Sequence, residues 1–254
     1  MDSAITLLLV VGAICLAVIV WAGRKRFPLR IGAGNFFRRK TQVAIVVAGL
    51  LIGTAIVSSS FVIQSTFDFT VRAAVFRALD AVDEVVFAAS PDGGRLPFSA
   101  QVYDNLSAHL ADMPTVDKIA PRLQLPAGVI DSTTQLFEPT ATVIGFDWER
   151  DLGAFVQANG SSWDGSGLGA TEAIINEKLA TAVEAKAGQS LIVNLGTPQG
   201  VARVSLTVKE IVRDEGRGAW NDAENLFVPL ATIQSAVGET GRINTITVAN
   251  IGGP

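Results

Sequence analysis

The residue types that most often carry out chemistry are scarce in this chain. His109 is its only histidine and Cys15 its only cysteine, so the sequence offers no cluster of imidazole and thiolate ligands for a transition metal. No G-x-S-x-G segment is present to hold a nucleophilic serine, and no G-x-x-x-x-G-K-S/T segment to bind the phosphates of ATP. We therefore expect a chain that is not an enzyme and holds no catalytic residue, metal or cofactor. We expect His109 to be a surface or half-buried residue of a helix.

Carboxylates are the remaining candidates for chemistry. Two groups of three lie close together in the sequence and could be calcium ligands or an acid and base pair. Their spacing does not match an EF-hand loop, and a solvated acidic surface is the favoured interpretation. The two groups are Asp80, Asp83 and Glu84, and Asp147, Glu149 and Asp151.

Two long apolar runs lie in the first quarter of the chain. Residues 4–22 and 43–63 contain no charged side chain, and each run is long enough to cross a hydrocarbon core of about 30 Å as a helix. A helix buried in a protein core is the less favoured alternative at these lengths. A cleaved signal peptide would need cations before its apolar run, whereas here the cations follow it. We therefore expect transmembrane helices at residues 1–23 and 43–64.

Positive charge is concentrated between these two runs. Residues 24–42 contain seven Lys or Arg and no acidic residue, so the positive-inside rule places this loop in the cytoplasm and the N-terminus outside. Residues 27–40 could form an amphipathic element that contacts membrane lipids, or a plain topogenic loop. The expected cytoplasmic interface consists of Arg24, Lys25, Arg26, Arg30, Phe36, Phe37, Arg38, Arg39 and Lys40.

The second apolar run contains a candidate for helix packing. Gly49 and Gly53 have the small-xxx-small spacing that lets two membrane helices approach closely. After the run, apolar residues recur near helical spacing, which predicts that the helix continues outward as a stalk at residues 65–80. The residues that carry this pattern are Phe67, Val71, Val75 and Leu79.

Residues 81–250 are expected to form an extracytoplasmic α+β domain. After residue 63 the chain has 13 Lys or Arg and 23 Asp or Glu, a formal charge of −10, which disfavours nucleic acid as a partner. We expect a loop at 159–169 and helices at 99–113, 147–157, 177–185 and 229–237. We expect strands at 84–89, 116–130 (interrupted by Pro121 and Pro126), 133–145, 172–176, 190–195, 201–212, 225–228 and 242–249.

Several segments together resemble one known family. Residues 29–53, LRIGAGNFFRRKTQVAIVVAGLLIG, resemble the start of FtsX/MacB-like ABC transporter permeases. The order and spacing of five further segments are similar to the MacB-like periplasmic core domain of that family. These are 142–151 (TVIGFDWERD), 172–188 (EAIINEKLATAVEAKAG), 206–216, 226–238 (LFVPLATIQSAVG) and 243–248 (INTITV).

The resemblance implies a transmembrane permease subunit with a MacB-like core domain anchored by two transmembrane helices. Such a subunit would work with a separate ABC-type ATPase in export, lipoprotein extraction or regulation of cell-wall enzymes. It would sit in the cell membrane as a multi-pass protein.

Two departures from the family pattern make us expect a fragment or half of a permease. The run at 4–22 precedes the helix that usually comes first, and residues 251–254 would lead to further helices. The remaining permease helices or a second permease copy would then be partners. The alternative is a membrane-anchored receptor or adhesion module without transport, and a tethered hydrolase is least favoured.

Overall fold

The computed structural model describes residues 16, 20, 40–79, 81–91, 93–110, 113–197 and 200–251. The predicted first span at 1–23 and most of the predicted basic loop lie outside these described residues, and so do residues 252–254. Among the predicted interface residues, Lys40 is described; Arg24, Lys25, Arg26, Arg30, Phe36, Phe37, Arg38 and Arg39 are not. The chain divides into two compact units, Met1–Phe69 and Thr70–Pro254, which are described separately below.

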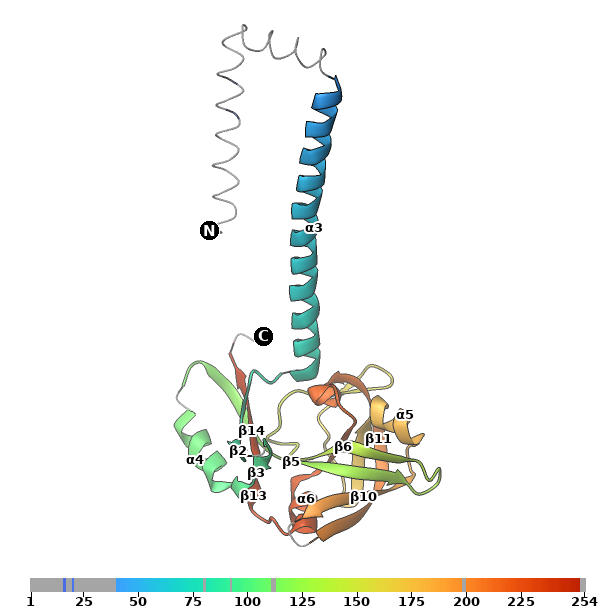
Figure 1. Cartoon of the computed structure of the whole chain (residues 1–254). Helices are drawn as coiled ribbons and strands as arrows, with labels where there is room; N and C mark the ends of the chain where they lie inside the picture. Colours follow the sequence, from blue (N-terminus) through green and yellow to red (C-terminus); the bar gives the residue numbers. More distant parts are fainter. Residues whose placement is uncertain are drawn as a thin grey trace. The chain divides into compact units, whose positions relative to one another are not determined.

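A single helix, α3, runs from Lys40 to Leu79 (Figure 1). It passes through both the predicted second span and the predicted stalk. No proline interrupts these residues, so the ladder of backbone hydrogen bonds can run unbroken. The hydroxyls of Thr54, Ser59 and Ser60 donate to the carbonyls of Leu51, Ala55 and Ile56 one turn earlier, which satisfies these polar groups within the helix.

Within the described residues, α3 provides the one candidate membrane span. Lys40–Val71 has a mean hydropathy of 2.2, and its most apolar stretch has no residue buried inside the chain. The sequence predicts two spans, but only this one is seen in the described part of the chain.

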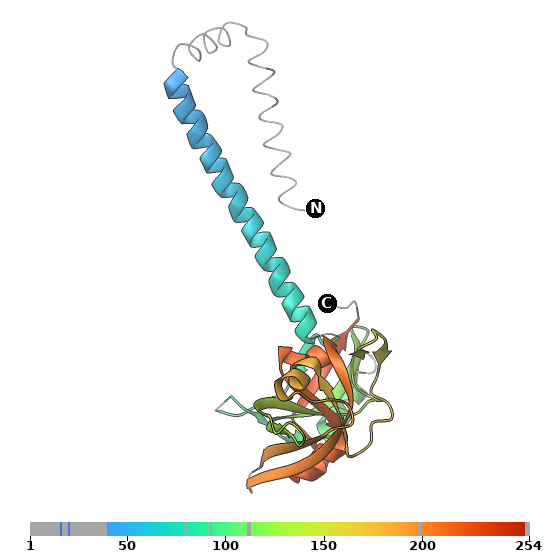
Figure 2. The ribbon, with the colours of Figure 1, turned by 90° about the vertical axis from the view of Figure 1, so that its right-hand side faces the viewer.

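The second unit is built around strands that close on themselves. β5 (Val116–Asp131), β6 (Phe137–Phe146), β12 (Asn225–Pro229), β9 (Glu172–Asn176), β11 (Gly200–Gly216) and β10 (Ser190–Thr197) pair in that order, and β10 returns to β5. The β6–β12 and β9–β11 pairs are parallel, and the other four are antiparallel. Figure 2 shows these strands turned by 90° from the view of Figure 1. The mixed α/β class expected from the sequence is confirmed.

Shorter elements extend the ring. β14 (Thr245–Asn250) pairs with the first half of β5, and β1 (Glu84–Val86) pairs with β14. β7 (Phe155–Gln157) joins β11, and β8 (Ser162–Trp163) joins β7. Two small ribbons pair β2 (Ala88–Ala89) with β3 (Arg95–Leu96), and β4 (Phe98–Ser99) with β13 (Arg242–Ile243). The helical segments of this unit are α4 (Gln101–Leu110), α5 (Glu177–Val183), α6 (Leu230–Val237) and the 3-10 segment η1 (Arg217–Asp222).

Alternation along the ring strands separates two cores. On β6, Ala141 and Val143 join an aliphatic cluster to which all six ring strands contribute, together with α5 and α6. Ile144 and Phe146, with the opposite parity, join a second cluster rich in aromatic rings. Because successive side chains of a strand point to opposite faces, the ring carries one core on each of its faces.

Two local expectations prove wrong. The prolines do not interrupt β5, which is one strand of 16 residues. Pro121 precedes the stretch that pairs with β6 from Leu123 onward. Pro126 lies between the residues that pair with β14, which end at Arg122, and those that pair with β10, which begin at Ala127. Pro121 is paired with Ile246 of β14 and Pro126 with Thr142 of β6, but each has no strand partner on its other side. On that side a missing N–H costs no ladder hydrogen bond.

The helix expected at 147–157 is not formed. A turn occupies its first half, with the backbone N–H groups of Arg150 and Asp151 bonded to the carbonyl of Asp147, and β7 occupies its end. The carbonyls of Leu152 and Gly153 accept hydrogen bonds from Arg217, far along the chain. Tertiary contacts thus take acceptors that a helix would have used.

Candidate functional site

The first candidate site is the apolar surface of α3. Gly49 and Gly53 are one turn apart, and a Cβ added at either would meet no other atom within 4 Å. Around them Val46 and Leu50 are 70% and 67% exposed. The described part of the chain thus leaves this helix surface uncovered.

The predicted stalk residues lie on the same helix. Phe67 and Val71 are 67% and 44% exposed, and Val75 and Leu79 fall within the last two turns of α3. Their role in coupling stays a prediction.

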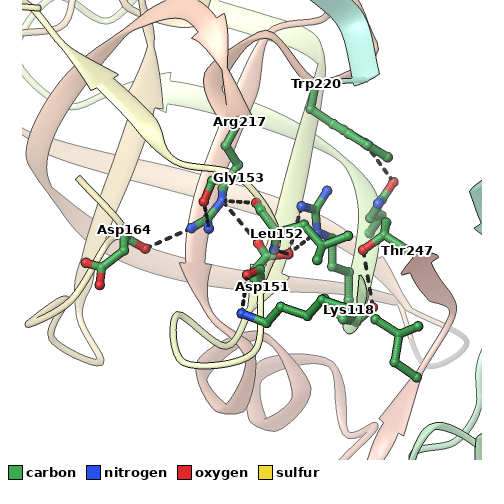
Figure 3. A network of polar contacts seen from close by, with 12 residues as sticks. Lys118, Asp151, Leu152, Gly153, Asp164, Arg217, Trp220 and Thr247 are labelled. Atoms are coloured by element: carbon green, nitrogen blue, oxygen red, sulfur yellow. Dashed lines mark hydrogen bonds and ion pairs between the residues drawn. The ribbon is translucent and has the colours of Figure 1, made fainter. Parts of the chain in front are cut away.

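The second candidate site is a buried group of charges that the sequence did not lead us to expect. Asp151 accepts from Arg122 of β5, with Oδ1 2.7 Å from Nη2 and 2.8 Å from Nε. Its other oxygen, Oδ2, lies 3.4 Å from Nε of Arg217 in η1. All three side chains are about 1% exposed or less. Figure 3 shows the group.

Arg217 joins three segments through its guanidinium. It donates to the carbonyls of Leu152, Gly153 and Asp164 at 2.9, 2.7 and 2.8 Å. It also lies over the rings of Phe146 and Phe155, 5.3 and 4.7 Å from their centroids. Planar guanidinium groups suit such simultaneous stacking and multiple donation. Arg217 therefore fixes the irregular segment between β6 and β9 onto the aromatic core.

Gln124 connects this group to the neighbouring strand β14. Its side-chain oxygen accepts from Arg95 at 2.6 Å and from the Trp220 indole at 3.3 Å. Its backbone exchanges hydrogen bonds with the Asn244 side chain. Arg122 stacks on Trp220 at 4.6 Å. Desolvation lowers the pKa of Arg95.

These contacts crosslink β5, β14, η1 and the segment that follows β6, but they assemble no reaction centre. The described residues include no group of three His, Cys, Asp or Glu placed to hold a metal. A buried ion pair that is bonded on several sides is destabilised strongly when one partner is removed. We interpret the network as a structural lock between segments distant in sequence.

The structure divides the predicted acidic surface. Glu149 is exposed and Asp147 half-buried, as expected of a solvated group, and His109 is an exposed residue of α4, also as expected. The prediction is wrong for Asp151, because two arginines surround it. The sequence contained one indication of a buried ion pair, because Arg122 is a lone cation in the apolar stretch of β5. Nothing in the sequence around Arg217 indicated that this arginine is buried.

A shallow pocket lies beside the network. Its volume is about 270 Å³, and its walls come from α4, the start of β5 and the turn after β6. Tyr103 and Ile119 line it, with Lys118 and Arg150 at its edge. Desolvation raises the pKa of Tyr103, and the nearby Arg150 cation opposes that rise.

The comparison with protein families decides the affiliation of this fold. The profile of the MacB-like periplasmic core domain matches residues 43–250. The chain belongs to this family. The resemblance drawn from the sequence is confirmed, and the described helix and ring of strands are those of a MacB-like periplasmic domain of ABC-type transporter permeases. The family is a component of transporters and not itself an enzyme.

Two solved structures are similar to the MacB-like chain. The periplasmic region of MacB from Actinobacillus actinomycetemcomitans is 13% identical, with a TM-score of 0.46 over 68% of this chain and 77% of that one. The extracellular domain of the noncanonic ABC-type transporter YknZ from Gram-positive bacteria is 14% identical, with a TM-score of 0.42 over 66% and 83%. None of the curated proteins compared with the chain matches it.

Proposed function

We propose that this chain is the transmembrane subunit, or part of one, of an FtsX/MacB-type permease that works with a separate ABC-type ATPase. In this proposal ATP hydrolysis in the cytoplasm is coupled to movement of the extracytoplasmic domain. The output would be export, lipoprotein extraction or regulation of a cell-wall enzyme. Family membership supports the permease class, and α3 supports the coupling.

The observation that carries the coupling proposal is the continuity of α3. One helix of 40 residues includes both the candidate span and the residues that lead into the domain. Helices bend sharply at defined defects such as proline or insertions in the hydrogen-bond ladder. The Thr54, Ser59 and Ser60 hydroxyls bond back to the preceding turn and can bend α3 slightly. No proline breaks the helix, so a tilt of its membrane part is transmitted along its length.

Breaking this helix at Val71, the last residue of the candidate span and beyond the span expected at 43–64, tests the proposal. Val71→Pro removes the backbone donor at residue 71 and introduces a clash with the preceding turn, at a local cost of about 3 kcal/mol or more. We expect the variant to insert and its domain to fold, but the assembled transporter to lose its activity while ATP turnover continues. Val71→Ala keeps the backbone ladder and is the matched control.

The measurement is substrate transport or release in membrane vesicles, alongside ATP hydrolysis by the same complex. Protease protection and tryptophan fluorescence of the domain verify insertion and folding. Full activity of Val71→Pro with normal ATP turnover would reject mechanical coupling through α3. It would favour a membrane-anchored receptor whose domain binds a ligand without transport.

A further inference from the structure

The pocket beside the buried network has the size of a site for one small group. Its volume of about 270 Å³ is just below the range of about 300–1,000 Å³ typical of drug-sized ligand sites. Its lining includes apolar side chains of Leu110, Val116 and Ile119 and the ring of Tyr103. It can therefore take one apolar group about as large as an aromatic side chain.

The two cations at the pocket already have partners. The Lys118 ammonium donates to the carbonyls of Glu149 and Asp151 at 3.3 and 3.0 Å. Arg150 lies 3.4 Å from the carboxylate of Asp147, and its guanidinium is 5.8 Å from the centroid of the Tyr103 ring. Arg150 is therefore paired with an opposite charge, whereas Lys118 keeps its positive charge, because its two acceptors are neutral carbonyls.

The two carboxylates at the pocket differ from the cations. Asp117 and Glu149 line it, and among the described residues neither side chain has a hydrogen bond or ion pair. The chain after residue 63 also carries the formal charge of −10, which attracts cations from solution. With Arg150 paired to Asp147, the two carboxylates outnumber the single Lys118 ammonium, so the net charge at this site is negative. The surface next to it is apolar.

We propose that this pocket binds a small organic cation with an apolar body, such as an aryl-alkyl ammonium. The apolar body would lie against Leu110, Ile119 and the Tyr103 ring, and the ammonium would lie between the carboxylates of Asp117 and Glu149. This site is independent of the coupling through α3. Its ligand would contact the Glu149–Asp151 turn, which Lys118 and the buried network hold in place.

Phenethylammonium is a suitable probe, because it combines one ring with one cation. The full chain in nanodiscs of zwitterionic lipid is titrated by calorimetry with phenethylammonium, with neutral 2-phenylethanol and with anionic 3-phenylpropanoate. We expect saturable binding of the cation that weakens with added salt, since exposed charges are screened. We expect at least tenfold weaker binding of the other two probes.

Variants assign the binding to this pocket. Asp117→Asn and Glu149→Gln are each expected to weaken binding about three- to fivefold, and together about tenfold, as for partly exposed charge pairs. Ser107→Trp, which fills the pocket from α4, is expected to abolish binding. Glu215→Gln removes the same charge from an exposed position outside the pocket and is expected to change nothing.

Three results would overturn the proposal. Absence of saturable cation binding would do so, as would equal binding of the neutral alcohol, which would leave an apolar cavity without charge selectivity. Unchanged affinity in the Asp117→Asn, Glu149→Gln double variant would place the cation elsewhere. Because no arm of the experiment measures transport, these outcomes leave the coupling proposal untouched.

Discussion

The helix α3 and the domain that follows it use apolar residues in opposite ways. Leu50 and Phe61 of α3 are 67% and 68% exposed, whereas Leu179, Leu191 and Phe227 of the domain are fully buried. Burial of apolar surface stabilises by about 25 cal/mol per Å², so the domain gains this energy from its own chain. The helix can gain it only from lipid or from another helix. The difference teaches that the domain specifies its own packing and that α3 is completed by its surroundings.

The strongest expected effect concerns the one place where the domain buries charge. Asp151→Ala leaves Arg122 and Arg217 buried without their shared carboxylate, and removing one partner of such a pair costs about 3–5 kcal/mol. We expect the free energy of unfolding of the domain to fall by that amount, measured by denaturant titration of tryptophan fluorescence in the full chain. The matched control is Asp147→Ala, whose half-exposed pair with Arg150 is expected to contribute less than about 1 kcal/mol.

Equal losses for Asp147→Ala and Asp151→Ala would contradict the idea that burial of the network matters. A loss below 1 kcal/mol for Asp151→Ala would mean that the arginines find water or new acceptors. In that case the buried ion pairs would contribute no more to the stability of the domain than its surface ion pairs do.

Two leucine truncations compare the regions directly. Leu179→Ala opens a cavity in the aliphatic core and is expected to cost about 2–5 kcal/mol of domain stability. Leu50→Ala removes the same atoms from an uncovered helix surface and is expected to change domain stability by less than about 0.5 kcal/mol. Denaturant midpoints of both variants, measured with the wild type, check the pair. A comparable loss from Leu50→Ala would show that α3 contributes to the domain's packing.

Sequence patterns predicted the domain well where packing is local. The strands at 172–176 and 225–228 and the helices at 177–185 and 229–237 were found within one or two residues, because apolar periodicity is a local signal. The structure adds a local reason for the helix start, since the Asn176 side chain caps it by accepting from the Leu179 N–H. The helix expected at 147–157 failed, because Arg217 captures its carbonyls from 64 or more residues away.

The closure of the strands and the buried network could not be read from sequence for the same reason. β10 pairs with β5, with Leu191 opposite Asp131, and no pattern within either strand indicates which strand is its partner. In the sequence Asp151 could not be distinguished from Asp147 and Glu149, which are more exposed. Only the fold brings two arginines to it. Local patterns indicate which segments form strands, whereas long-range pairing decides which charges are buried.

Gly49 tests whether another helix completes α3. Gly49→Ile adds a branched side chain at a position where an added Cβ meets nothing within 4 Å beyond the adjacent backbone of its own helix, so insertion and domain folding are expected to persist. Close packing of a partner helix would be lost, seen as reduced co-purification with the remaining permease helices or with a tagged second copy. Gly49→Ala is the milder control. Undiminished co-purification of Gly49→Ile would leave lipid as the sole neighbour of this surface.

The smallest expected effect contrasts two aspartates of the domain. In the described part of the domain each has one buried carboxylate oxygen without a hydrogen-bond partner. Asp151 forms ion pairs with two buried arginines, whereas Asp214 of β11 forms no such pair with an arginine among the described residues. Desolvation raises the pKa of Asp214 above its ordinary value of 3.8, with Lys178 opposing the rise.

A raised pKa in the folded state means that folding favours the protonated form. The resulting contribution to stability is fully present below pH 3.8 and is lost as the pH rises through the folded-state pKa. At pH 7 the ionised Asp214 carboxylate thus slightly lowers the free energy of unfolding of the domain. Asp214→Asn is expected to raise the free energy of unfolding by up to about 0.5 kcal/mol at pH 7, a small value because water screens this half-exposed group.

The gain from Asp214→Asn is expected to shrink as the pH falls toward 4, because the wild-type carboxyl then becomes protonated and neutral like the amide. Denaturant midpoints of both proteins at pH 7 and pH 4 measure the difference. A loss of stability at pH 7 would mean that attraction to Lys178 outweighs desolvation. Asp214 would then resemble Asp151, a carboxylate whose cation compensates for its burial, and the contrast within the domain would disappear.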